Sequence, residues 1–167
     1  NAAITLKASI LRRQDDFTDA LAVISDLVKK DPLDFRAANE NYLLAKRSHD
    51  SHLSEKLLTD LNRKMRDFDQ NYLELGISYL DDGLTDEAED VFSRFNGRNP
   101  EILYYLGCIQ DKKGNKAEAE ILFKNGSELS TDYVFPFRLE TVNILKRVSE
   151  YHPDDAKPWY YLGNLLY

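Results

Sequence analysis

The sequence predicts an all-α fold made of antiparallel helix hairpins. Glycine and proline, which interrupt helices, number only 7 and 5 among the 167 residues. Leucine occurs 24 times, whereas isoleucine and valine, which favour strands, occur 8 and 6 times. Similar groups of residues also recur along the chain at a spacing of about 34, which is typical of proteins built from stacked structural repeats.

The repeat is clearest between residues 75 and 123. Five residues of the first block recur 31 positions later, and the matching pairs are Leu75 with Leu106, Gly76 with Gly107, Gly83 with Gly114, Ala88 with Ala119, and Phe92 with Phe123. A shift of two periods of about 34 relates Ala88 to Ala20 and Pro100 to Pro32. The pattern starts again with Trp159, Leu162 and Gly163, and Trp159 is expected at a position that packs helix against helix.

Each type of repeated position has a physical role in a helix hairpin. Gly76 and Gly107 are expected in the middle of helices, where a second helix must approach the backbone closely. Gly83 and Gly114 suit the left-handed conformation that ends a helix. The expected N-caps of the helices that follow are Thr85 and Asn115.

The spacing predicts four hairpins followed by a less regular C-terminal part. The eight hairpin helices are expected at residues 3–14, 17–30, 33–47, 51–66, 69–82, 85–96, 99–113 and 116–129. The second unit is degenerate, because it lacks both the glycine and the A-x-x-x-F motif. In the first unit Asp15 stands where later units have the turn glycine.

The residues after Thr131 depart from the repeat. Residues 133–137 hold three aromatic side chains and Pro136, so we expect a buried wedge and then an amphipathic helix over residues 137–151. A last helix containing Trp159 ends the chain soon after the repeat restarts. Residues 3–167 are therefore expected to form one continuous domain, a fragment of a longer protein, with residues 1–2 left from an expression tag.

These motifs resemble the tetratricopeptide repeat, a helix-turn-helix unit with W-x-x-L-G-x-x-Y, A-x-x-x-F and a terminal proline. The resemblance implies a right-handed α-solenoid, TPR-like, whose concave face binds proteins or peptides. The segments 133–140 and 160–167 resemble a bacterial family of tetratricopeptide proteins whose repeats follow a mutarotase-like β-sandwich. That second resemblance implies a carbohydrate-related context for the parent protein.

Charge and composition exclude several functions. The net charge of −7 disfavours binding to nucleic acid, and no apolar run approaches the roughly 18 residues that would insert into a membrane. The charge is uneven, since residues 1–66 contain 12 Lys and Arg against 10 Asp and Glu, whereas residues 67–167 contain 10 against 19. The single cysteine gives no information on the compartment, so the localisation stays open.

No group of residues predicts catalysis, a metal site or a cofactor. His49 and His52 have a spacing that could bind a metal, but they fall in a predicted turn without a third ligand. Cys108 is expected to be a buried packing residue, because nothing nearby in the sequence would activate its thiol. The chain is therefore predicted not to be an enzyme.

The family resemblance also implies which residues line the concave groove. Thr5 and Ser9 replace the Lys and Asn with which chaperone-binding members hold a terminal carboxylate, so another ligand is expected. The groove residues carried over are Arg12, Arg13, Arg36, Asn39, Lys46, Arg47, Leu73, Ile77, Tyr104 and Tyr160. The five cations among them predict a site for an acidic peptide, unless Asp15, Asp16 and Glu40 neutralise them as surface ion pairs.

The function expected from these observations is a non-catalytic scaffold that presents its groove to a protein or peptide, or to the N-terminal region of its own parent protein. Two alternatives remain open. The chain could be an accessory segment that packs on the β-rich region of a carbohydrate-active bacterial enzyme, or a module for homo-oligomerisation.

Overall fold

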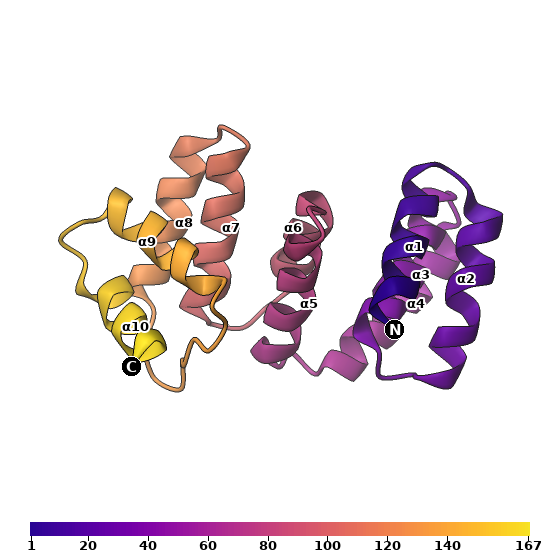
Figure 1. The fold of residues 1–167 in the computed structure, drawn as a ribbon, viewed down its shortest axis with the longest axis horizontal. Helices are drawn as coiled ribbons and strands as arrows, with labels where there is room; N and C mark the ends of the chain where they lie inside the picture. Colours follow the sequence, from indigo (N-terminus) through magenta and orange to yellow (C-terminus); the bar gives the residue numbers. More distant parts are fainter. The chain divides into compact units, whose positions relative to one another are not determined.

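The computed structural model describes residues 1–167, which form ten α-helices and no strand (Figure 1). In chain order the helices are α1 (Ala2–Arg13), α2 (Phe17–Lys30), α3 (Phe35–Arg47), α4 (Ser51–Met65), α5 (Asp69–Asp81), α6 (Thr85–Ser93), α7 (Pro100–Lys112), α8 (Lys116–Glu128), α9 (Thr141–Tyr151) and α10 (Ala156–Leu166). The predicted all-α class is confirmed, and the predicted boundaries of α1 to α8 agree within three residues. No helix combines the length and the apolar composition needed to span a bilayer.

The chain divides into two compact units, residues 1–71 and residues 72–167. The expectation of one continuous domain over residues 3–167 stays a prediction.

The N-terminal unit contains the hairpins α1–α2 and α3–α4. Its core includes Ala8 of α1, Ile24 and Leu27 of α2, and Ala37 of α3. The alanines let neighbouring helices approach closely, while the larger side chains of α2 fill the space between them. Three helices of this unit begin after an aspartate whose carboxylate accepts a backbone N–H of the first turn, namely Asp16, Asp34 and Asp50.

A left-handed residue follows the first helix of each of the four hairpins. Gly83 and Gly114 adopt φ values of 72° and 86°, which confirms their predicted role. In the N-terminal unit this conformation is adopted by Asp15 and His49, each with φ 61°. Side chains at such positions cost roughly 1 to 2 kcal/mol relative to the right-handed region, so the two hairpins form despite this local cost.

The predicted N-caps of the second helices need correction. Thr85 is the first residue of α6, and Leu84, whose side chain can make no capping hydrogen bond, is the N-cap. Asn115 is the N-cap of α8, but its side chain makes no capping hydrogen bond. Its amide instead donates to Oε1 of Gln110 at 2.8 Å.

In the C-terminal unit, two helix glycines allow the close approach of a second helix that the sequence predicts, and a phenylalanine ring lies against each of them. A Cβ atom placed on Gly76 would lie 2.3 Å from the ring of Phe92, and one on Gly107 would lie 2.3 Å from the ring of Phe123. Both rings are fully buried, so these contacts lie in the centre of the hairpins α5–α6 and α7–α8. Glycine is needed here because any side chain would occupy the space of the ring.

The segment between α8 and α9 is not the buried wedge that the sequence predicts. Val134 and Pro136 are buried, whereas Tyr133 is 92% exposed, Phe135 71% and Phe137 56%. Tyr133 is a left-handed turn residue with φ 61°, and residues 134–138 form no helix or strand. Val134 is the residue of this segment that joins the core cluster of the unit. The helix expected from residue 137 also begins later, at Thr141, after a turn.

Helices α9 and α10 complete the C-terminal unit. Leu145 and Val148 of α9 share a core cluster with Tyr161 of α10 and Phe123 of α8. Trp159, which the repeat pattern predicts to be a packing residue, is 53% exposed. That prediction is wrong for this structure, since Trp159 is not part of the core cluster that Tyr161 and Leu162 of the same helix join.

Candidate functional site

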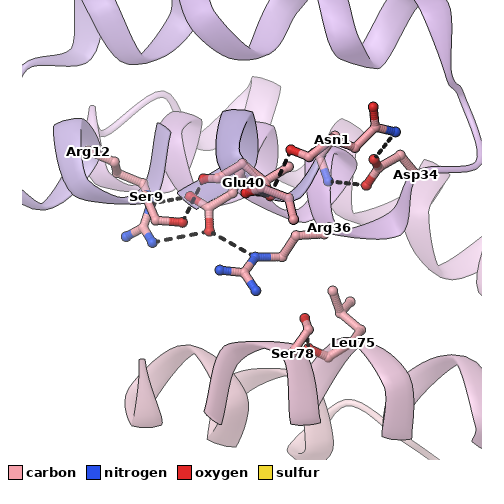
Figure 2. A network of polar contacts seen from close by, with 11 residues as sticks. Asn1, Ser9, Arg12, Asp34, Arg36, Glu40, Leu75 and Ser78 are labelled. Carbon is pink, nitrogen blue, oxygen red and sulfur yellow. Dashed lines mark hydrogen bonds and ion pairs between the residues drawn. The ribbon is translucent and has the colours of Figure 1, made fainter. Parts of the chain in front are cut away.

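The basic residues predicted for the groove lie on α1 and α3 of the N-terminal unit, and two of them surround a buried carboxylate. Arg12 donates from Nε to Oε2 of Glu40 at 2.9 Å and from Nη2 to Oε1 at 3.5 Å (Figure 2). Nε of Arg36 lies 3.9 Å from Oε1 of the same carboxylate. Glu40 is 1% exposed, so this charge is compensated inside the protein. Arg12 therefore contributes to the connection between α1 and α3, whereas Arg36 lies one turn from Glu40 on α3 itself.

The other three cations, Arg13, Lys46 and Arg47, are exposed. They lie in the last turns of α1 and α3, where positive side chains interact favourably with the helix dipole. Nε of Arg47 donates to Oδ1 of Asp15 at 2.7 Å, and this hydrogen bond lowers the pKa of the Asp15 carboxyl. Nζ of Lys46 lies 5.5 Å from the centre of the Tyr42 ring, a cation–π geometry.

The remaining predicted groove residues differ in accessibility. Asn39, Leu73, Ile77 and Tyr104 are buried, whereas Tyr160 is exposed. The hydroxyl of Tyr104 lies 3.2 Å from Oγ of Ser127, and burial raises the pKa of this tyrosine to about 12. Of the ten residues, Arg13, Lys46, Arg47 and Tyr160 are exposed, and Arg36 is partly exposed.

The residues considered for catalysis or metal binding lie in unsuitable surroundings. His49 is the left-handed turn residue after α3, and His52 lies in the first turn of α4. No group of three or more His, Cys, Asp or Glu side chains has a geometry that could hold a metal ion. Burial raises the pKa of the Cys108 thiol to about 12, so it stays protonated near neutral pH, and the prediction that it is a packing residue is confirmed.

Two polar clusters in the C-terminal unit were not found from the sequence. In the first, Asp111 of α7 accepts hydrogen bonds from Nε of Arg147 at 2.7 Å and from the hydroxyl of Tyr151 at 2.5 Å. These donors lower the pKa of Asp111. The partners are 36 and 40 residues away in the chain, and no local spacing identifies such a pair.

The second cluster is a buried hydrogen-bond chain between α7 and α9. The Tyr105 hydroxyl donates to Oγ1 of Thr141 at 2.8 Å, and Thr141 donates to Oε1 of Glu101 at 2.9 Å. Burial raises the pKa of Tyr105, which keeps its hydroxyl a donor. Both clusters hold α9 against α7, which is a structural role.

The fold is that of a helix-hairpin repeat protein. Residues 73–125 match the sequence profile of a tetratricopeptide repeat family. This range covers most of α5 and α8 and all of α6 and α7, where the Gly–Phe contacts lie.

No curated protein matches the chain significantly. The resemblance of the last 40 or so residues to a bacterial family with a mutarotase-like β-sandwich is therefore unsupported, and residues 1–167 contain no strand.

Proposed function

We propose that the chain is a non-catalytic scaffold that binds other proteins. The observation that carries this proposal is the tandem of helix hairpins α5–α6 and α7–α8, which matches a tetratricopeptide repeat family over residues 73–125. Repeats of this kind generally bind proteins or peptides on surfaces formed by adjacent hairpins. The chain also has no motif or metal-ligating cluster that would suggest chemistry of its own.

The ligand that we propose is an acidic peptide segment, bound by the basic surface of the N-terminal unit. We define this surface by Arg13, Lys46 and Arg47, which are exposed at the ends of α1 and α3. A guanidinium group can form two parallel hydrogen bonds with a carboxylate, which gives both affinity and orientation. The exposed pair of Arg47 with Asp15 is a weak competitor, because surface ion pairs contribute little.

The other predicted groove residues have supporting roles in this proposal. Arg12 and Arg36 both face the Glu40 carboxylate, and the Arg12 pair joins α1 to α3, so a ligand would meet the exposed cations. Whether Leu73, Ile77 and Tyr104 contribute to binding stays a prediction, and their burial argues for packing roles first.

Charge reversal tests the proposal. The variant Lys46→Glu/Arg47→Glu is compared with Lys29→Glu/Lys30→Glu, which makes the same charge change on exposed residues of α2. The probe is a fluorescently labelled oligoglutamate peptide at low ionic strength. We expect the first variant to lose at least roughly tenfold in affinity and the second to retain it, with binding weakened by salt. Equal losses in both variants would show non-specific attraction and contradict the proposed surface.

A further inference from the structure

The short segment that joins α6 to α7 contains an asparagine followed directly by a glycine, Asn96-Gly97. In such a dipeptide the backbone nitrogen of the glycine can attack the side-chain amide of the asparagine, because a glycine has no Cβ to obstruct the approach. The reaction therefore depends on whether the surrounding structure leaves the two groups free to meet.

The two reacting groups of Asn96-Gly97 are free. Both residues are exposed, and residues 95–99 form no helix or strand. The Gly97 N–H donates no hydrogen bond, and the Asn96 side chain has no hydrogen-bond partner. Exposed segments of this kind change conformation more readily than the helices that they connect.

The chain contains a second Asn-Gly dipeptide in a different environment. Asn125-Gly126 lies inside α8, where the backbone dihedral angles are fixed and each N–H belongs to the hydrogen-bond ladder of the helix. Gly126 is also buried, and a Cβ placed on it would lie 2.6 Å from the ring of Tyr104. At this pair the glycine nitrogen cannot reach the side-chain amide without breaking the helix.

We propose that Asn96-Gly97 is a site of spontaneous modification, at which Asn96 converts to a mixture of isoaspartate and aspartate. The backbone nitrogen of Gly97 bonds to Cγ of Asn96, and the side-chain nitrogen leaves as ammonia with the proton of the Gly97 amide. One water molecule then opens the resulting cyclic imide. Water that adds at the backbone carbonyl carbon gives isoaspartate, and water that adds at Cγ gives aspartate. The reaction consumes water alone and involves no oxidation or reduction.

The isoaspartate product would lengthen the main chain between two fixed residues. On one side, the ring of Phe95 packs against Tyr72 of α5 with ring centres 5.2 Å apart and fills the space beside Gly97. On the other side, Asn99 is the N-cap of α7 and accepts a hydrogen bond from the Glu101 N–H at 2.8 Å. Because isoaspartate inserts a methylene group into the backbone between these residues, one of the two contacts must weaken. The modification therefore loosens the connection between the hairpins α5–α6 and α7–α8.

Ageing of the full chain at mildly alkaline pH tests the proposal, because base removes the amide proton of Gly97. Trypsin places the two Asn-Gly pairs in different peptides, residues 95–98 and residues 125–138. We expect the first peptide to show the mass increase from a carboxamide to a carboxyl group and to separate into two products, while the second keeps its mass. In denaturant both peptides should change. Conversion of neither pair in the folded protein, or of both at equal rates, overturns the proposal.

Two variants at Asn96 separate the modification from its effect on the fold. Asn96→Gln should resist ageing, because its longer side chain would have to close a larger ring. Asn96→Asp, measured when freshly prepared, introduces the negative charge without the longer backbone and should melt at the temperature of unaged wild type. Aged wild type should melt at a lower temperature, and aged Asn96→Gln should not. If aged wild type contains isoaspartate and its melting temperature is unchanged, the proposed loosening of the two hairpins is wrong.

Discussion

The two units of the chain build helix hairpins with different chemistry. In the C-terminal unit, Gly76 and Gly107 let a phenylalanine ring fill the space between paired helices, and Gly83 and Gly114 end the first helices. In the N-terminal unit no such pair occurs. There, alanines and a buried ion pair connect α1, α2 and α3, and side chains such as His49 occupy the left-handed turns.

A helix hairpin can therefore form without the glycine and phenylalanine residues of the repeat motif. The match to a tetratricopeptide repeat family covers residues 73–125, where the Gly–Phe contacts occur, and does not extend into the N-terminal unit. The family profile matches the hairpins that pack through glycine and phenylalanine. Helix length, caps and apolar spacing are sufficient for the hairpin itself. Substitutions in the two units should therefore have different effects on stability.

Within the N-terminal unit, substitution of Glu40 should lower the free energy of unfolding the most. The variant Glu40→Gln leaves Arg12 buried without its counter-charge, so we expect a loss of about 3 to 5 kcal/mol in the free energy of unfolding. Chemical denaturation measures this value. The control is Asp15→Asn, which breaks an exposed pair and should leave the denaturation midpoint nearly unchanged. Similar values for both variants would show that the buried pair is no more important than a surface one.

In the C-terminal unit, substitution of Gly107 should also lower the stability of the fold. Alanine there places a Cβ 2.3 Å from the Phe123 ring, so the core must shift, at a cost of about 1 to 3 kcal/mol. Gly163 occupies the same repeat position but has no neighbour within 4 Å, and Gly163→Ala should stabilise α10 by about 0.5 to 1 kcal/mol. Thermal melts of the two variants should therefore move in opposite directions. Destabilisation by both would mean that glycine is required for the helix rather than for the ring contact.

The positions of the helices and the close helix approach at Gly76 and Gly107 could be predicted from the sequence, because both depend on local patterns. Helix boundaries follow from caps and apolar periodicity, and a glycine in a helix predicts a close neighbour. The exposed state of Trp159 was missed because the pattern assumes a following helix. The aromatic residues of the 133–137 segment were placed in the core on hydrophobicity alone, whereas the path of this irregular segment buries Val134 and Pro136 and leaves the three rings exposed.

The candidate site was only partly predictable. The family register assigned five cations of α1 and α3 to the groove, but it did not reveal that two of them face the buried Glu40 carboxylate. Pairings between residues about 30 positions apart, such as Arg12 with Glu40, depend on how two helices pack. The contacts of Asp111 with α9 are of the same kind.

Asp111 should make the C-terminal unit sensitive to acid. Because hydrogen bonds lower its pKa in the folded state, its contribution to stability is present above the unfolded value of about 4 and is lost as the pH falls through the folded value. The melting temperature of Asp111→Asn should lie below that of the wild type at neutral pH, and the two should converge in strong acid. A constant difference at all pH values would contradict the ionic role of this carboxylate.

Substitutions at the left-handed turns should have opposite effects on stability in the two units, because one introduces a glycine and the other removes one. His49→Gly removes the cost of a side chain at φ 61° and should stabilise the protein by up to about 1 kcal/mol, whereas Gly83→Ala introduces that cost and should destabilise by about 1 kcal/mol. Denaturation midpoints measure both effects. If His49→Gly destabilises, the side chain of His49 makes a contact that outweighs its backbone strain.

The smallest effect is expected for Phe135, in the segment that belongs to neither type of hairpin. Its ring is 71% exposed, so Phe135→Ala should change the free energy of unfolding by less than about 0.5 kcal/mol. Its neighbour Val134 lies in the core cluster of the C-terminal unit, and Val134→Ala should cost about 1 to 2 kcal/mol despite the smaller side chain removed. The order of the two effects is therefore the reverse of the order of side-chain size. Urea denaturation of both variants decides whether burial, rather than the size of the apolar side chain, determines which residues of the segment stabilise the fold. A larger loss for Phe135→Ala would place its ring in a packed environment.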